Sequence, residues 1–118
     1  MRKGLISGLL VVAAIAVVII VIANSSPTTY SPTFSATATL NFPSTGASSS
    51  SDLTITVTGA ADGDAVFIGV PNGSIVANSI FTAWVSASNT VKIRFSNLDI
   101  LNAGDPASGT FRAVVIKQ

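Results

Sequence analysis

Cysteine, histidine and glutamate are absent from this 118-residue chain. Without cysteine and histidine, the chain cannot build a disulfide, a His/Cys zinc site, or the Ser-His-Asp and Cys-His arrangements of nucleophilic catalysis. Charged residues make up only 9% of the sequence, against about 25% in an average soluble domain. The formal net charge of +1 argues against nucleic acid as a partner. These absences favour a protein without enzymatic activity and without a cofactor.

The mean hydropathy of +0.65 is high, and the excess is concentrated near the N-terminus. Residues 5–23 read LISGLLVVAAIAVVIIVIA and carry no charge. As a helix with a rise of about 1.5 Å per residue, this run is roughly 28 Å long, which matches the hydrocarbon core of a bilayer. We therefore predict one transmembrane helix, a signal anchor, over residues 1–23. Its anchoring side chains include Leu5, Leu9, Val12, Ile15, Ile19 and Ile22.

Arg2 and Lys3 precede the apolar run, and no further basic residue occurs before Lys92. By the positive-inside rule, the N-terminus is expected inside and the C-terminal part of the chain outside. Gly4 and Gly8 form a GxxxG spacing, which in lipid lets helices approach closely, so both are candidate helix-association residues. The sequence thus predicts a single-pass membrane protein whose partners include the lipid bilayer.

Two other interpretations of the N-terminal segment are open. A cleaved secretory signal is compatible with Val21 and Ala23 ahead of Asn24, although the apolar run exceeds the usual length of about 7–15 residues. The leader Met-Arg-Lys-Gly, ending at Gly4, resembles that of type IV pilins, which keep their apolar helix after cleavage and bundle it in a filament core. The glutamate that bacterial pilins usually carry past the cut is replaced here by Leu9.

Residues 24–33, NSSPTTYSPT, are polar, uncharged and interrupted by two prolines, which predicts an extended linker. From residue 34 onward, apolar residues alternate with polar ones, which is the period of a strand with one buried face. This pattern and the turn sequences predict about six strands. They lie near residues 34–42, 53–58, 65–70, 80–87, 91–96 and 110–117. The run 65–70 is nearly continuously apolar, as expected of a central strand.

We therefore predict an all-β domain over residues 34–118, a small antiparallel β-sandwich that is jelly-roll-like and follows the transmembrane helix. Ser88 and Asn89 supply the turn chemistry of a tight hairpin. Most phenylalanines fall on inward strand positions and are expected in the core. Trp84 lies opposite the face that carries Phe81 and Val85, so it is either an exposed contact residue or the filler of a second layer.

Trp84, Lys92 and Arg94 form the candidate contact surface. Lys92 and Arg94 share one strand face, where a small basic patch meets an anionic surface or a glycan; the alternatives are solubilising residues or guards of an edge strand. Asp62 and Asp64, separated by one glycine, and nearby Asp52 form the only acidic cluster. This cluster falls short of the about six to eight ligands that Ca²⁺ takes, so its members are expected to be solvated turn carboxylates. We predict no catalytic, cofactor-binding or metal-binding residue.

Three segments resemble a small β-domain that recurs in bacteriophage structural proteins, often at the end of tail-fibre or other virion-surface chains. They read SSSSDLTITVTGAADGDAV at 48–66, FTAWVSASNTVKIRFSNL at 81–98 and DPASGTFRAVVIK at 105–117. The resemblance covers about residues 38–118 and implies no catalytic residue. Fibre-type carriers usually lack a membrane anchor, so the predicted helix shifts the expectation to a surface or spike protein of a membrane-containing virion.

The sequence thus predicts a non-enzymatic, membrane-anchored structural protein of a virion membrane or surface. We expect it to form a homo-oligomer and to contact other virion or surface proteins, because its low charge and many small polar side chains suit close repetitive packing. Two alternatives stay open. One is a receptor- or glycan-binding adhesin or spike module that uses Trp84 and the loops at 43–52 and 97–109. The other is a subunit of a pilus-like cell-surface filament.

Overall fold

The computed structural model describes residues 32–118. The predicted transmembrane helix, its association residues Gly4 and Gly8, and most of the predicted linker lie outside the described residues. Six strands and one short 3-10 helix follow one another along the described chain. They are β1 (Thr33–Leu40), β2 (Ser50–Thr56), β3 (Ala65–Gly69), η1 (Asn72–Ser74), β4 (Ser79–Ala87), β5 (Thr90–Asn97) and β6 (Gly109–Ile116). Within residues 32–118, no helix is long and apolar enough to cross a membrane.

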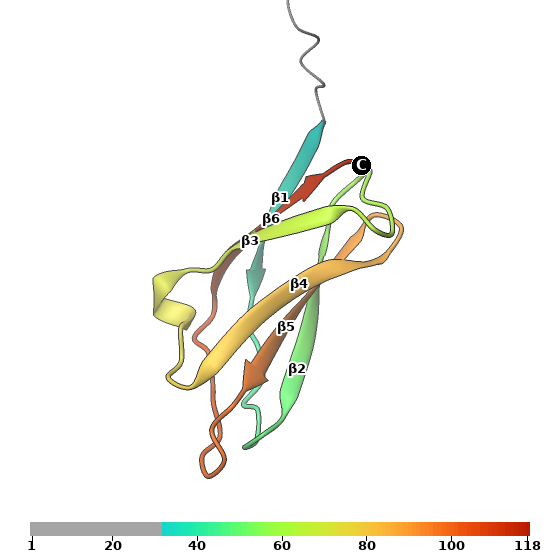
Figure 1. Ribbon diagram of the computed structural model, residues 1–118. Helices are drawn as coiled ribbons and strands as arrows, with labels where there is room; N and C mark the ends of the chain where they lie inside the picture. Colours follow the sequence, from blue (N-terminus) through green and yellow to red (C-terminus); the bar gives the residue numbers. More distant parts are fainter. Residues whose placement is uncertain (1–31) are drawn as a thin grey trace, which may run out of the picture. The chain divides into compact units, whose positions relative to one another are not determined.

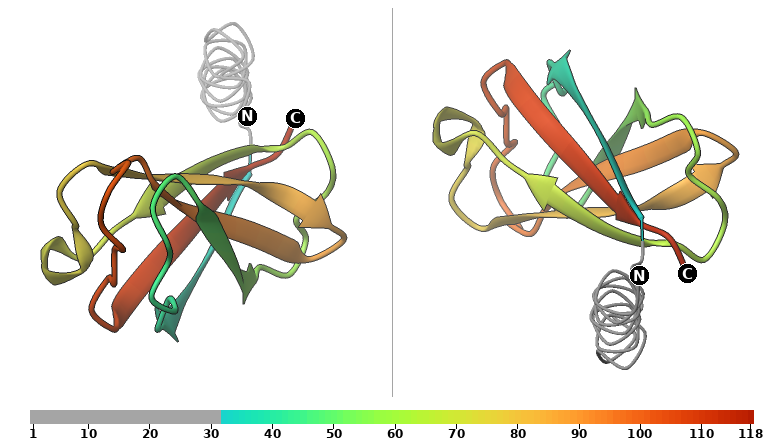
Figure 2. Two further views of the ribbon diagram at one scale, coloured as in Figure 1. Left: turned by 90° about the horizontal axis from the view of Figure 1, so that it is seen from below. Right: turned by 90° about the horizontal axis from the view of Figure 1, so that it is seen from above.

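The strands form two antiparallel sheets of three strands each, in the orders β1-β6-β3 and β2-β5-β4. The two sheets are facing layers (Figures 1 and 2), in which β3 lies next to β4 and β1 lies next to β2. Among the described strands, only β4 and β5 follow one another within one sheet, through the expected hairpin at Ser88 and Asn89. The expected six-stranded, all-β sandwich is confirmed.

The core lies between the sheets and consists of the inward residues of the alternating strands. Phe42, Phe81, Phe95 and Phe111 meet at its centre, with ring centroids 5.3 to 6.1 Å apart in the five contacting pairs. Edge-on and tilted contacts of this kind stabilise a core beyond the area that they bury. The expected core position is confirmed for these four phenylalanines.

β3 is an edge strand, which corrects the expectation of a central strand for residues 65–70. It pairs with β6 alone. Its residues alternate between half-buried Val66 and Ile68 and exposed Phe67, whose surface is 60% exposed. A continuous apolar run predicts burial on both faces, but within the described residues no further layer covers the outer face of this sheet.

Asp64 joins the C-terminal end of the chain to the start of β3. Lys117 Nζ lies 2.6 Å from Asp64 Oδ2 and donates a second hydrogen bond to the carbonyl oxygen of Gly59 at 3.0 Å. The hydrogen bond from Lys117, followed by those from the backbone N–H groups of Ala61 and Gln118, holds the pKa of Asp64 below its usual value. Only 4% of the Asp64 side chain is exposed, so it is not the solvated carboxylate that its turn position predicts. The start of β3 pairs with the end of β6, and this brings the residues that follow β6 into contact with Asp64.

Candidate functional site

The predicted contact residues Trp84, Lys92 and Arg94 lie together on the outer face of the β2-β5-β4 sheet. Trp84 stands directly opposite Lys92 in the β4–β5 register, and Arg94 follows on the same face. The Arg94 guanidinium carbon lies 5.0 Å from the centroid of the Trp84 ring, and Lys92 Nζ lies 6.0 Å from it. Both distances allow cation–π attraction. The three residues therefore form one cluster.

This cluster has an acidic member, Asp52, which is a strand residue paired with Arg94 and not the solvated turn carboxylate that the sequence predicts. Asp52 on β2 is the register partner of Arg94 on β5. Arg94 Nε donates to Asp52 Oδ1 at 2.8 Å, and Arg94 Nη2 donates to Oδ2 at 2.9 Å. This two-bond contact lowers the pKa of Asp52 and raises the pKa of Arg94. The alternation of β2 places Asp52 on the outer face, but only the register between two distant segments reveals its partner.

The cluster is therefore not the open basic patch that the sequence predicts. Arg94 is neutralised by Asp52 and stacked on Trp84, while Lys92 makes no salt bridge within residues 32–118. β5 is the central strand of its sheet, so the interpretation of Lys92 and Arg94 as guards of an edge strand is wrong. Trp84 is 36% exposed, which makes it a surface residue and not the filler of a second layer.

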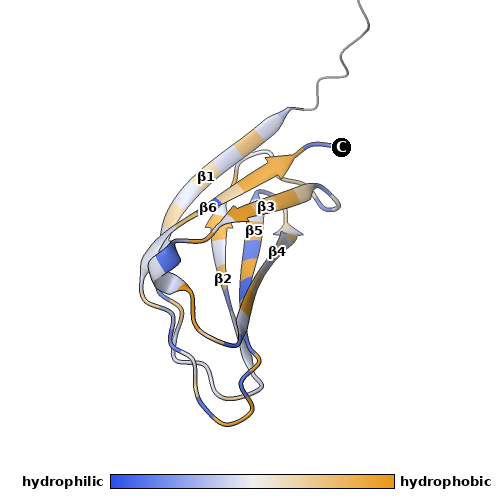
Figure 3. Cartoon of the chain, turned by 60° about the vertical axis from the view of Figure 1, so that its left-hand side comes forward, coloured by the Kyte–Doolittle hydropathy of each residue, from blue (hydrophilic) through white to orange (hydrophobic). Residues whose placement is uncertain are grey.

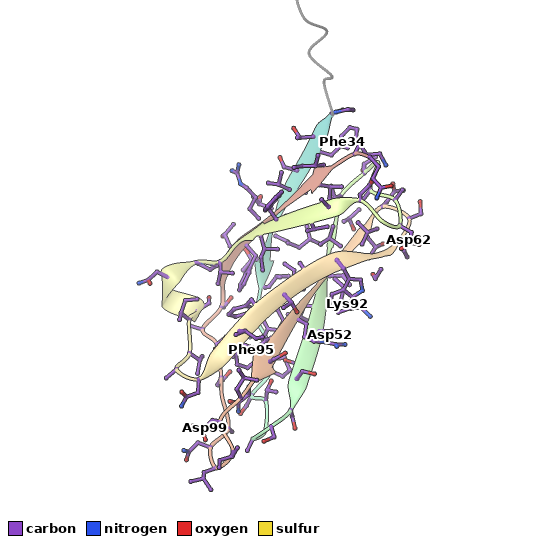
Figure 4. All side chains as sticks on the ribbon, viewed as in Figure 1. Phe34, Asp52, Asp62, Lys92, Phe95 and Asp99 are labelled. Atoms are coloured by element: carbon purple, nitrogen blue, oxygen red, sulfur yellow. The ribbon has the colours of Figure 1, made fainter. Side chains whose placement is uncertain are left out.

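A group of exposed apolar side chains occupies the loop after β5. Leu98, Ile100 and Leu101 expose 57%, 77% and 83% of their surfaces, and we call residues 98–101 the tip. Figure 3 shows this orange segment at the lower end of the domain, and Figure 4 places Asp99 there. Grouped apolar side chains with this exposure make the tip a candidate interaction surface. Their signal in the sequence is an apolar cluster inside a segment that otherwise reads as a loop.

The side chains of Asn97, as a donor, and Asp99, as an acceptor, brace the tip with hydrogen bonds. The Asn97 side chain is 2% exposed, and its Nδ2 donates to three backbone carbonyl oxygens, those of Thr45 and Gly46 at 3.1 Å and that of Asn102 at 2.9 Å. Asp99 Oδ1 accepts hydrogen bonds from two backbone N–H groups of the same loop, at 2.8 and 2.9 Å. These backbone donors lower the pKa of Asp99. The tip is thus a braced projection.

The loops at 43–52 and 97–109 meet at this end of the sandwich, as the adhesin alternative requires. Thr45 and Gly104 exchange backbone hydrogen bonds of 2.7 and 2.8 Å. A cleft of about 350 Å³ opens beside them, lined by Ser48, Ser49, Ser50, Ser96, Asn97 and Leu98. The structure does not bring Trp84 to this cleft. Trp84 lies five positions from Ser79 at the nearer end of β4, or about 16 Å at about 3.3 Å per strand residue.

A further apolar surface lies on the outer face of the β1-β6-β3 sheet, near the start of β1. Ala65 pairs with Ile116, and Phe67 pairs with Val114, so these four residues form one block that we call the β3–β6 patch. Figure 3 shows β3 and β6 as largely apolar. Beside the patch, β1 presents only serine and threonine on this face. Arg112 is the one charged side chain on the outer face of the sheet.

Comparison with known protein families, curated proteins and solved structures gives no match. Among the residues that the structure describes, no group of three or more acidic side chains is placed to hold a metal ion. The geometry of the tip, the β3–β6 patch and the Trp84 cluster is therefore the basis for a functional assignment.

Proposed function

We propose that the chain is a non-enzymatic structural subunit. In this proposal, residues 5–23 anchor it in a membrane, with the N-terminus inside and the β-sandwich outside, and the sandwich self-assembles with further copies. The observation that carries the proposal is the β3–β6 patch. Phe67, 60% exposed, stands beside Val114 on a sheet face with a single charged side chain. An exposed apolar surface of this kind marks a protein contact.

The free edge of β1 supports self-assembly on the same face. β1 is an edge strand of eight residues, TFSATATL, with no charge, proline or register shift. Soluble proteins commonly protect such edges with lysine, proline or a β-bulge, because unpaired backbone groups recruit other strands. A second copy can therefore approach the β1-β6-β3 sheet without burying a charge from β1.

Two settings fit such a subunit. The resemblance to phage structural domains supports the surface of a membrane-containing virion, where the sandwich contacts other virion proteins. Four of the five strand connections cross between the sheets, which supports a jelly-roll-like description of the domain. A pilus-like filament is the second setting, supported by the basic leader that ends at Gly4. The mass of the native chain separates the two settings, because only the pilus-like leader predicts the loss of residues 1–4.

The experiment for the proposed function uses the full chain in a detergent micelle and in reconstituted vesicles. We expect resistance to alkaline extraction from membranes and, in sedimentation velocity, species larger than one copy per micelle. Phe67→Asp places a charge in the β3–β6 patch, so the larger species should be lost while the circular dichroism spectrum is kept. The matched control Thr54→Asp lies on the opposite sheet and should assemble normally. A chain that stays monomeric at all concentrations, or that alkaline treatment extracts, overturns the proposal.

A glycan-binding adhesin is the second candidate function, and the serine-lined cleft favours it. Hydroxyl groups of Ser48, Ser49 and Ser50 line one side of a cleft beside the braced tip, and hydroxyl groups both donate and accept hydrogen bonds. Retention of the wild-type chain on a glycan array, with loss in Ser49→Val and no loss in Thr54→Val, supports this function. If the wild-type chain is not retained on the array, the glycan-binding function is rejected.

A further inference from the structure

We propose that the tip of one copy seats on the β3–β6 patch of the next copy, so that the sandwiches join head to tail. The inference rests on the proposed self-assembly and names the interface through which it occurs. It commits to a second copy of this chain as the occupant of both surfaces.

The two surfaces lie at opposite ends of the sandwich. Ile116 pairs with Thr33 at the start of β1 and with Ala65 at the start of β3, so the patch lies at the end where the chain enters the domain. The tip follows Asn97, at the far end of β5. Figure 4 shows the same separation, with Phe34 at the upper end and Asp99 at the lower end. One copy therefore cannot cover its own patch with its own tip.

Two dissimilar surfaces determine the kind of assembly. A two-fold dimer joins a surface to itself, whereas a head-to-tail contact joins two different surfaces and leaves one of each free at the ends of the row. The tip is a narrow projection braced by Asn97 and Asp99, and the patch is one face of a sheet. A braced projection loses little conformational freedom when it binds, so the tip is prepared for contact with a flat apolar face.

Arg112 on the patch face and the acidic side chains of the tip loop have opposite charge, while Asp64 and Lys117 at the border of the patch pair with each other and Asp62 lies in the turn before β3. The loop from Leu98 to Ser108 carries Asp99 and Asp105 as its only charged residues. On the outer face of the β1-β6-β3 sheet, Arg112 is the one charged side chain. Opposite charges at the rim of an apolar contact favour one docking orientation over others. Tip-to-tip contact, in contrast, brings acidic groups together.

A lipid surface is the competing occupant of the tip. Asp99 lies between Leu98 and Ile100, and burial of a carboxylate in hydrocarbon is costly. The backbone N–H groups that bind Asp99 also lower its pKa and so favour its charged form. A second copy can place the positively charged Arg112 near Asp99 of the tip, whereas hydrocarbon offers the carboxylate no partner.

The absence of cysteine from the sequence allows a direct test by disulfide cross-linking. Leu101→Cys and Phe67→Cys change side chains that are 83% and 60% exposed, so neither removes a core contact. The two full-length variants are purified separately in detergent, mixed, and oxidised with copper phenanthroline. Thr54→Cys, on the outer face of the other sheet, replaces Phe67→Cys in the matched control mixture.

We expect a disulfide-linked dimer in the mixture of Leu101→Cys with Phe67→Cys, and its loss in the control mixture and in each variant alone. The double variant should give a ladder of higher multimers. A dimer of Leu101→Cys alone, or equal linkage to Thr54→Cys, overturns the head-to-tail contact.

Two further outcomes separate this inference from the proposed function. Larger species in sedimentation velocity without the specific disulfide overturn the tip-to-patch contact alone, while a monomeric chain overturns both proposals. A dye at Leu101→Cys that shifts its emission on addition of phosphatidylglycerol vesicles, without cross-linking to Phe67→Cys, assigns the tip to lipid and overturns the inference.

Discussion

Arg94 and Asp52 face each other across β5 and β2 and share two parallel hydrogen bonds of 2.8 and 2.9 Å, while the Trp84 ring lies 5.0 Å from the same guanidinium group. The Asp52 carboxylate and the Trp84 ring thus both contact the Arg94 side chain. Arginine suits this position because its flat guanidinium both stacks on an aromatic ring and forms a fork with a carboxylate. The arrangement turns a predicted basic patch into a cluster in which Asp52 offsets the charge of Arg94 and Lys92 keeps its own.

Arg94→Lys should shift the fluorescence emission of Trp84 to longer wavelength and slightly lower the midpoint of thermal unfolding. Lysine cannot form the two-bond contact with Asp52, and it leaves the Trp84 ring more exposed to water. Trp84 is the only tryptophan in the chain, so the emission reports this site alone. Arg112→Lys, on the other sheet, is the control and should leave the emission unchanged. Unaltered emission in Arg94→Lys would contradict the stacking.

Besides acting through Asp99, whose pKa the tip backbone lowers, acid should destabilise the domain through Asp52 and Asp64. Both carboxyl groups have folded-state pKa values below their ordinary values, because Arg94 and Lys117 donate hydrogen bonds to them. Their stabilising contribution is therefore complete above the unfolded-state pKa of about 4 and is lost as the pH falls through the lowered folded-state values. Urea unfolding between pH 6 and pH 2 measures this loss.

Asp64→Asn tests the assignment of that loss. The variant should be less stable than wild type at pH 6 and should show a weaker dependence on pH below 4, since its amide does not titrate. Asp62→Asn, two positions away in the same turn and exposed, should reproduce the wild-type profile. An unchanged pH profile in Asp64→Asn would rule out its role in acid unfolding.

Phe111→Ala and Phe67→Ala should separate stability from assembly. Phe111 is fully buried and contacts Phe42 and Phe81, so its truncation should lower the free energy of unfolding by about 3–5 kcal/mol. Phe67 is mostly exposed, so its truncation should change that free energy by less than about 0.5 kcal/mol while it weakens self-assembly. Urea unfolding and sedimentation velocity measure the two effects, and a large stability loss in Phe67→Ala would contradict its surface position.

Gly109→Ala should destabilise the fold where β6 begins. A Cβ atom at this position would lie 2.6 Å from Pro71 Cγ and 2.9 Å from Ser74 Oγ, and Ser74 is itself buried and hydrogen-bonded to the carbonyl oxygen of Ala107. Overpacking of this kind costs about 1–3 kcal/mol. Gly73→Ala is the control, because nothing lies within 4 Å of its Cβ position. Equal unfolding midpoints for the two variants would argue against the close contact.

Asn97→Ala should loosen the tip. The change leaves three carbonyl oxygens without the donor that they share, and the loss of such a buried partner costs about 1–3 kcal/mol. Hydrogen exchange at Leu101 and Asn102 should accelerate more than exchange in the central strand β6. The exposed Asn41 gives the matched variant Asn41→Ala, which should exchange like wild type. If the tip amides stay protected from exchange in Asn97→Ala, the hydrogen bonds of Asn97 do not hold the tip.

Much of the fold follows from local pattern. The alternation of apolar and polar residues predicts four of the six strands on the correct face, because side chains point to opposite faces of a strand at every step. Ser88 and Asn89 predict the β4–β5 hairpin, and Asn89 adopts the left-handed conformation with φ 59° that such turns need. The same alternation places Lys92, Arg94 and Trp84 on outer faces, so the sequence alone predicts that these candidate residues lie on the surface.

The sequence by itself determined the all-β class, the inward phenylalanines and the chemistry that missing side chains exclude, because these depend on composition and on spacing within one segment. Only the tertiary structure decided that β3 is an edge strand, that Asp52 faces Arg94 and that Asp64 forms a salt bridge with Lys117. Each of these relations joins segments more than forty residues apart or depends on which strands are neighbours. Periodicity identifies the buried face of a strand, but strand order and register come from the packing of the whole domain.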